Sequence, residues 1–264
     1  MLPGLRNCVV TRYNKRKHRV LFRGLYNGMS VVGKCAPADA LDLAVEVVQQ
    51  GAVMNGGGGD AMPRSLFLGH HGTSSLAKHF VDPTELTTIF DERTLLDLII
   101  TEDFGPTLYQ HAQRQDVAPQ ALDHQCLLAL RAAFKVAQDL RDMGIAHQDL
   151  NGGNVRHDGT QFIDWETATT VQCGNPSVNG HTCGWQTNFA DTTQAADVFT
   201  AVSSIASANS QLFLVGALRL WLFGTTDDNT REMSMYLCYR PYDHVTFASA
   251  IDKIDSILHA FYMP

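Results

Sequence analysis

Residues 147–166 constrain this chain more than any other stretch of its sequence. They contain a His-x-Asp pattern that ends at Asp149, an asparagine five residues later, Asn154, and a second aspartate, Asp164, behind two apolar residues. Between the last two, Asp158-Gly159 is a strong signal for a two-residue hairpin turn. The hairpin would bring Asn154 and Asp164 to the same end of a short two-stranded ribbon. The sequence therefore predicts that Asp149, Asn154 and Asp164 surround one Mg²⁺–phosphate site.

This stretch resembles the catalytic and metal-binding loops of the protein-kinase-like superfamily, which includes protein kinases and small-molecule kinases of the aminoglycoside and choline type. The resemblance implies that Asp149 orients an acceptor hydroxyl and takes its proton. It also implies that Asn154 and Asp164 hold Mg²⁺ against the phosphates of ATP. The resemblance extends over nearly the whole chain, but only residues 147–166 are specific. The alternative is a polar turn in an ordinary α/β domain.

The residues before this stretch favour the same interpretation. Apolar side chains recur at near-helical spacing in residues 120–143, and Gly144 ends the predicted helix. A long buried helix that is followed at once by the His-x-Asp pattern is the order that the resemblance implies for a larger, helical lobe.

The N-terminal third predicts a β-sheet. A basic turn at residues 14–18 and the hairpin signal Asn27-Gly28 separate three strands, and two later apolar runs would complete a five-stranded sheet. The expected strands cover residues 7–12, 19–26, 29–35, 65–69 and 95–101.

By the resemblance, Lys34 at the end of the third strand pairs with the α- and β-phosphates of ATP. The apolar pattern of residues 37–53 predicts a helix, and this helix would offer a carboxylate to the lysine. Glu46 is the best candidate and Asp42 is the alternative. A surface lysine and an exposed helix charge are the ordinary readings of these residues.

The glycine-rich loop of the superfamily is missing. It should fall near residues 13–17, where there is no glycine. Backbone amides approach phosphates closely only where side chains are absent. We therefore hypothesise that Lys15, Arg16 or Lys17 contacts the phosphates by charge.

A second phosphate-loop pattern overlaps Lys34. Residues 28–35 are one residue short of the G-x-x-x-x-G-K-[ST] loop of another nucleotide-binding class. Their last residue is a cysteine, which lacks the hydroxyl that binds Mg²⁺ in that loop. The central Met-Ser-Val-Val also favours an extended strand.

We interpret residues 102–105 (Glu-Asp-Phe-Gly) as a hinge between two lobes, because the pair Gly105-Pro106 stops the fifth strand. The resemblance implies that backbone groups from Glu102 to Phe104 meet adenine. A short helix at residues 107–114 would then begin the second lobe.

Several positions depart from the protein-kinase pattern. Gln148 replaces the arginine that normally meets a phosphorylated activation loop, and Asn151 replaces a lysine that neutralises developing phosphoryl charge. Asp164-Trp165-Glu166 replaces Asp-Phe-Gly, and is more like small-molecule phosphotransferases. Loss of that glycine makes a backbone flip there less favourable.

Features nearer the C-terminus resemble protein kinases. Asp197 lies in a predicted helix at 193–208, where it would accept hydrogen bonds from the catalytic-loop backbone; an ordinary N-terminal helix charge is the alternative. Arg240 precedes a proline, and we hypothesise that it pairs with Asp191. Further helices are expected at residues 212–223, as a buried helix, and at residues 252–261.

Charge and cysteine usage limit the class of protein. The chain of 264 residues has a net charge of −7, yet residues 1–38 hold eight Lys/Arg and no acid. This basic segment could attract polyphosphate or nucleic acid, although a solvated basic hairpin is the simpler reading. The six cysteines lack CxxC spacing and suit a reduced intracellular protein. Cys173, His181 and Cys183 share a loop that could bind metal, but no fourth ligand is evident.

We therefore expect an α+β, two-lobed protein-kinase-like fold, with a small antiparallel sheet lobe plus one helix and a larger, mainly helical lobe. The expected boundaries are 1–101 for the N-lobe, 102–105 for the hinge and 106–264 for the C-lobe.

The expected reaction is transfer of the γ-phosphoryl group of ATP, with Mg²⁺, to a hydroxyl, and a protein serine or threonine is the preferred acceptor. A small-molecule kinase and a weakly active pseudokinase scaffold are the alternatives. We expect ATP and a protein substrate as partners, without a membrane or nucleic-acid partner. The expected compartment is cytoplasm or nucleus, and the divergence would suit a viral protein in a host cell.

Overall fold

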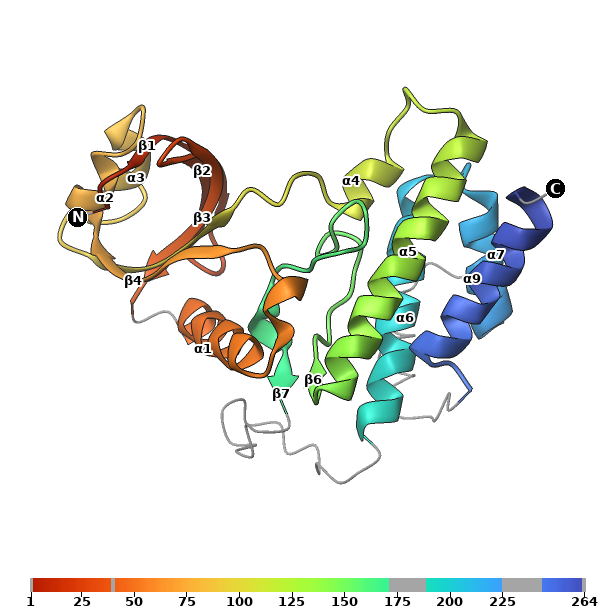
Figure 1. Ribbon diagram of the computed structural model, residues 1–264. Coiled ribbons are helices and arrows are strands. Elements are labelled where there is room, and N and C mark those ends of the chain that lie inside the picture. The colour runs from red at the N-terminus through yellow and green to blue at the C-terminus, as the bar shows by residue number, and fades with distance from the viewer. Residues whose placement is uncertain (1, 39–40, 171–188, 225–243, 263–264) are drawn as a thin grey trace. The chain divides into compact units, whose positions relative to one another are not determined.

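The chain has an antiparallel five-stranded sheet in its N-terminal part and a helical C-terminal part (Figure 1). This is the α+β class expected from the sequence, and it is consistent with a two-lobed kinase-like fold. The computed structural model describes residues 2–38, 41–170, 189–224 and 244–262.

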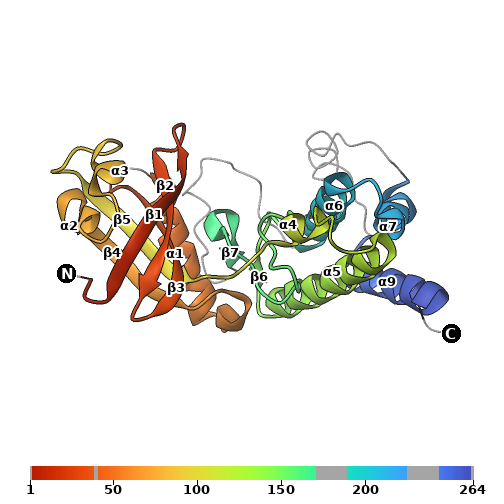
Figure 2. The same cartoon turned by 90° about the horizontal axis from the view of Figure 1, so that it is seen from above.

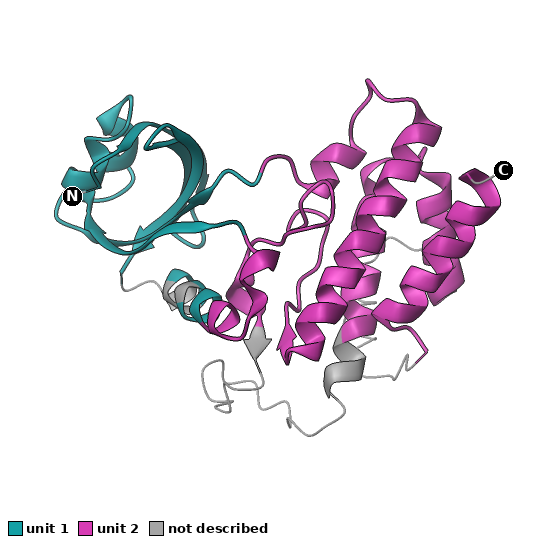
Figure 3. Ribbon diagram, in the orientation of Figure 1, with its two compact units in different colours: residues 1–51, 63–104 teal, residues 52–62, 105–264 magenta. Residues whose placement is uncertain are grey.

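The chain divides into two compact units (Figure 3). Unit 1 comprises residues 1–51 and 63–104, and unit 2 comprises residues 52–62 and 105–264. The sequence did not indicate that residues 52–62 belong with the helical unit.

The sheet of unit 1 has the strand order β1-β2-β3-β5-β4, with every neighbouring pair antiparallel. Asn27 and Gly28 have φ angles of 52° and 86°, the left-handed conformation that a two-residue hairpin between β2 and β3 requires. All five predicted strands are present; β2 has its predicted bounds and the others are longer. The strands are β1 (Leu5–Asn14), β2 (Arg19–Tyr26), β3 (Met29–Pro37), β4 (Ser65–Gly72) and β5 (Leu95–Glu102).

Two short helices, α2 (Thr73–Ala77) and α3 (Pro83–Thr87), complete the apolar core on one face of this sheet (Figure 2). Phe22 is fully buried in that core, and Gly33 lies directly opposite it on β3. A Cβ atom on Gly33 would lie 2.0 Å from the Phe22 ring, so only glycine leaves room for the aromatic side chain. Neither short helix was predicted, because five residues are too few to show helical periodicity.

The opposite face of the sheet meets α1 (Leu41–Asn55), whose Leu43 packs with Ala36 and Ile99. The sequence placed the start of this helix at Pro37. That start was wrong, because Pro37 is still paired with β5 as the last residue of β3.

The glycine-rich segment after α1 has regular structure. It forms a short 3₁₀ helix, η1 (Gly58–Ala61). A Cβ atom on Gly58 would lie 2.7 Å from Val53 and 2.8 Å from Leu140. The glycines therefore let this segment pack closely within unit 2.

Unit 2 is built around α5, which is the long helix predicted from periodicity and carries buried residues along its length. The last helix begins at Phe247, five residues before its predicted start. Thr246 and Ser249 exchange side-chain and backbone hydrogen bonds there and cap the first turn. The helices are α4 (Leu108–Ala112), α5 (Pro119–Asp142), α6 (Phe189–Ala208), α7 (Phe213–Phe223) and α9 (Phe247–Tyr262).

Helix α7 was expected to be buried, but only one side of it is. Val215 and Leu218 are in the core, whereas Phe213 is 77% exposed and Trp221 is 53% exposed. Among the described residues, no helix combines the length and the apolar character that crossing a bilayer requires.

Candidate functional site

The catalytic-type loop follows α5 directly. Gly144, with a φ of 77°, ends the helix, and the chain passes through the two-residue strand β6 (Ile145–Ala146) to His147. The His147 side chain is buried, its Nε2 lies 3.0 Å from the Ile163 carbonyl oxygen, and its ring meets Trp165 at a centroid distance of 4.6 Å. His147 therefore fastens the first loop of the motif to the second.

The Asp149 carboxylate is held by two amides. Asn151 Nδ2 donates to Asp149 Oδ1 at 2.9 Å, and Asn154 Nδ2 donates to Asp149 Oδ2 at 2.9 Å and to its carbonyl oxygen at 3.0 Å. Burial raises the pKa of Asp149, and the charges of Asp164 and Glu166 act in the same direction, against the two amide hydrogen bonds. The carboxylate is thus oriented and is a stronger base than an exposed aspartate.

The predicted ribbon is present in its shortest form. Val155 and Phe162 form an antiparallel bridge, and Ile163 N donates to the Asn154 carbonyl oxygen at 2.9 Å. Asp164 follows immediately with a φ of 64°, a left-handed conformation. The ribbon therefore brings Asn154 and Asp164 to the same end, as expected.

These residues suit a hard divalent cation. Because Asn154 Nδ2 is directed at Asp149, its Oδ1 is left to act as an acceptor. An amide oxygen and the Asp164 carboxylate are the oxygen ligands that Mg²⁺ prefers. The chemistry of these two donors therefore suits Mg²⁺, and the magnesium site itself stays a prediction.

Asp197 of α6 accepts hydrogen bonds from the backbone of the loop that carries Asp149. Asp197 is 5% exposed, and it accepts hydrogen bonds from Leu150 N at 3.2 Å and from the backbone of Gln148. Burial and the Asp149 charge raise the pKa of Asp197 to about 7, against these backbone bonds. The expectation that Asp197 accepts hydrogen bonds from this backbone is confirmed. Ser204, also on α6, accepts a further bond from Gly152 N at 2.7 Å.

Unit 1 holds the predicted ion pair. Lys34 Nζ lies 2.6 Å from Glu46 Oε1, and the Glu46 side chain is fully buried. Gln50 Nε2 also donates to Glu46 Oε1, at 3.2 Å. Glu46 is thus the acid that meets Lys34, and the side chain of the alternative, Asp42, is outside the described residues.

Sequence reasoning missed a second cation at Glu46. Arg19 Nη1 lies 3.8 Å from Glu46 Oε2, and the Arg19 side chain is only 8% exposed. The signal was available in the strand pattern, because Arg19 and Leu21 lie on the same side of β2, and Leu21 is paired with Lys34.

In the segment interpreted as a hinge, Glu102 N already donates to the Arg64 carbonyl oxygen at 3.0 Å, and Asp103 N donates to that of Ser30 at 2.9 Å. Within the described part of the chain, the Phe104 N–H has no acceptor. The Glu102 N–H is therefore already used within the protein, whereas the Phe104 N–H is available to a ligand.

Several expectations lie outside the described residues. These are the Asp191–Arg240 pair and the loop with Cys173, His181 and Cys183. The cysteines that the structure describes are buried free thiols: Cys8, Cys35 and Cys126.

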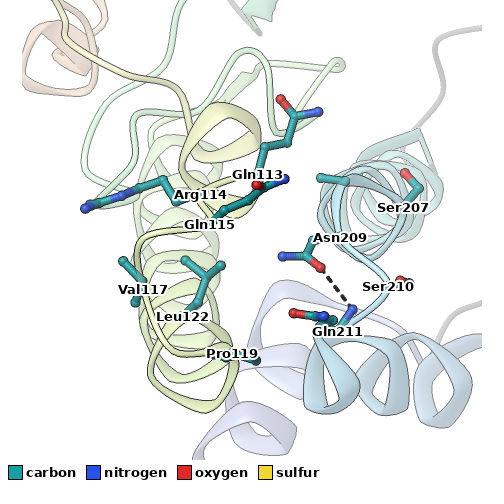
Figure 4. Close-up of a pocket in the computed structure, with 11 residues that line it drawn as sticks. Gln113, Arg114, Gln115, Val117, Pro119, Leu122, Ser207, Asn209, Ser210 and Gln211 are labelled. Atoms are coloured by element: carbon teal, nitrogen blue, oxygen red, sulfur yellow. Dashed lines mark hydrogen bonds between the residues drawn. The ribbon is translucent and has the colours of Figure 1, made fainter.

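A pocket of about 840 Å³ lies elsewhere in unit 2 (Figure 4). It opens between the residues that join α4 to α5 and those that join α6 to α7, and Gln113, Gln115 and Asn209 line it. None of the residues predicted for phosphoryl transfer lines this pocket.

No family model matches the chain, and no curated protein matches it by sequence. Among solved structures, the chain is similar to one described as "WaaP in complex with acyl carrier protein". The two are 15% identical with a TM-score of 0.41, and the match covers 95% of this chain and 88% of that chain.

Proposed function

We propose that this protein is an ATP-dependent phosphotransferase that moves the γ-phosphoryl group of Mg·ATP to a hydroxyl. The observation that supports this most is the Asp149 carboxylate, which is held by Asn151 and Asn154 beside Asp164. Partial burial disfavours the ionised form of a carboxylate, so a half-buried carboxylate held by two amides is costly to keep for structure alone. Such an arrangement is typical of a positioned base.

In this proposal Asp149 accepts a hydrogen bond from the acceptor hydroxyl, orients it towards the γ-phosphorus and takes its proton as the new O–P bond forms. The bond between the γ-phosphorus and the bridging oxygen of the β-phosphate breaks, and ADP leaves with that electron pair. Asn154 Oδ1 and Asp164 would hold Mg²⁺, which would neutralise charge on the phosphates. Lys34, oriented by Glu46, contacts the α- and β-phosphates, and the Phe104 N–H contacts adenine.

We prefer a protein serine or threonine as the acceptor. The support is the Asp197 contact with the backbone of the loop, in the sequence context that resembles protein kinases. One observation favours a small-molecule acceptor instead: Trp165 is buried against His147, and Glu166 stands where protein kinases have a flexible glycine. Phosphate incorporation into a generic protein substrate, measured beside an aminoglycoside and choline panel, would separate the two.

The proposed reaction is tested by Mg·ATP turnover of the unaltered protein and of Asp149→Asn. The asparagine keeps the size of the side chain but cannot take a proton, so we expect turnover to fall by about 100-fold or more. Asp139→Asn, on the exposed side of α5, is the matched control and should leave turnover unchanged. Equal turnover by Asp149→Asn and the unaltered protein would contradict the proposal and favour a binding scaffold.

A further inference from the structure

The basic residues of the first three strands lie on one face of the sheet. In the strand register, Arg12, Leu21 and Lys34 form one cross-strand row, and Arg23 lies in the next row beside Val9 and Val32. Residues that are directly opposite in a sheet point to the same face, as do residues two apart on one strand. The basic residues that share this face, called here the cationic face, are Arg6, Arg12, Arg19, Arg23 and Lys34.

The other face of the same strands is apolar. Phe22 and Cys35 point into the core that α2 and α3 complete. The basic residues of these strands are therefore concentrated on one face of the sheet. The described carboxylates on this side of the sheet include Glu46, which meets Arg19 and Lys34, and Asp103, which lies 3.6 Å from Arg23. Asp97 of β5 shares this face as well, and it is paired with His70.

The turn between β1 and β2 is poorly suited to binding phosphate through its backbone N–H groups. Asn14 Oδ1 accepts hydrogen bonds from Arg16 N at 3.1 Å and from Lys17 N at 3.2 Å. Backbone N–H groups at this turn are the ones that a glycine-rich loop would direct at phosphates. Since Asn14 already uses two of these N–H groups, side-chain charge is the better means of holding a phosphate here.

The cations of the cationic face differ in how deeply they are buried, and this arrangement suits a chain of phosphates. Arg12 is exposed at one end of its row, whereas the Arg19 and Lys34 side chains are 8% and 16% exposed at Glu46. Neighbouring strands are about 4.8 Å apart, so the Cα atoms of Arg12 and Lys34 are separated by roughly 10 Å. Guanidinium groups can reach across such a gap and bind phosphate oxygens in pairs.

We propose that Arg12 and Arg19, together with Lys34, bind the polyphosphate of a nucleoside triphosphate and take the place of the missing glycine-rich loop. The identity of the ligand rests on the proposed function above. The turn residues Lys15, Arg16 and Lys17 are then peripheral, which differs from the hypothesis drawn from the sequence.

The test measures binding of three probes to the full chain: ATP, inorganic tripolyphosphate and adenosine. Arg12→Gln and Arg19→Gln should each weaken ATP and tripolyphosphate binding by about tenfold and leave adenosine binding unchanged. Arg19→Lys should retain more affinity than Arg19→Gln, because it keeps the charge beside Glu46. Arg93→Gln, at an exposed position of unit 1, is the matched control and should bind all three probes normally.

Three results would overturn the inference: no binding of tripolyphosphate by the unaltered protein, normal binding by Arg12→Gln and Arg19→Gln, or an equal loss for adenosine. Loss of phosphate affinity only in a Lys15/Arg16/Lys17→Ala variant would assign the role to the turn instead. The Asp149 turnover experiment tests the proposed function independently. If the protein is active but its affinity for ATP and tripolyphosphate does not depend on Arg12 and Arg19, only this inference is refuted. Tripolyphosphate binding that depends on Arg12, without turnover, refutes the proposed function alone.

Discussion

Asp197 and Asp149 are two carboxylates at the same loop, and they differ in the groups that donate hydrogen bonds to them. Asp149 receives side-chain amides and faces the proposed acceptor, whereas Asp197 receives backbone N–H groups and is nearly inaccessible. The local spacing of the motif predicted Asp149, and the resemblance to protein kinases predicted Asp197. Neither predicted Arg19 at Glu46, because that contact depends on strand register and on α1 together.

The raised pKa of Asp197 predicts a pH dependence of stability. Its value in the folded protein, about 7, lies above the ordinary 3.8, so the unfolded chain ionises first as pH rises. The contribution of protonated Asp197 is therefore complete below about pH 4 and is lost as the pH rises through about 7. Asp197→Asn does not ionise, so its free energy of unfolding should fall less between about pH 5 and pH 8 than that of the unaltered protein.

Urea unfolding at the two pH values measures this difference. Asp139→Asn provides the baseline, because it removes one exposed carboxylate and should keep the normal pH dependence. Parallel curves for Asp197→Asn and the unaltered protein would show that Asp197 does not titrate in this range.

Among the elements, those with a strong local signal were predicted well. The basic turn at residues 14–18 and the Asn27-Gly28 turn predicted the first three strands, and helical periodicity predicted α5. The short helices α2, α3 and η1 were missed, because a segment of one turn has no periodicity and depends on packing within its unit. The start of α1 was misplaced for a related reason. Proline favours the first turn of a helix, but Pro37 is instead paired with β5.

The contact between Gly33 and Phe22 predicts the effect of a single methyl group. Gly33→Ala should destabilise the protein by about 1–3 kcal/mol, because its Cβ would meet the buried ring. Gly51→Ala is the matched control: nothing lies within 4 Å of its Cβ, and alanine favours the helix by about 0.5–1 kcal/mol. Chemical unfolding of both variants should give opposite signs, and equal stabilities would contradict the packing argument.

At the scale of the whole molecule, each unit has its own group of polar side chains. Unit 1 contains Lys34, Glu46 and the cationic face, and unit 2 contains Asp149, Asn154 and Asp164. The sequence predicted the fold class and the order of the five strands and the longer helices, because these elements have their own local signals. It could not identify the acceptor, because the residues that select a substrate carry no spacing rule comparable to that of the catalytic loop.

The central claim is that Asn154 and Asp164 hold one divalent ion on the phosphates of a nucleotide. Electron paramagnetic resonance with Mn²⁺ in place of Mg²⁺ measures this directly, in the presence of a non-hydrolysable ATP analogue. We predict one nucleotide-dependent Mn²⁺ per chain in the unaltered protein and in the control Asp158→Asn, and loss of that ion in Asp164→Asn. Undiminished, nucleotide-dependent Mn²⁺ binding by Asp164→Asn would contradict the account.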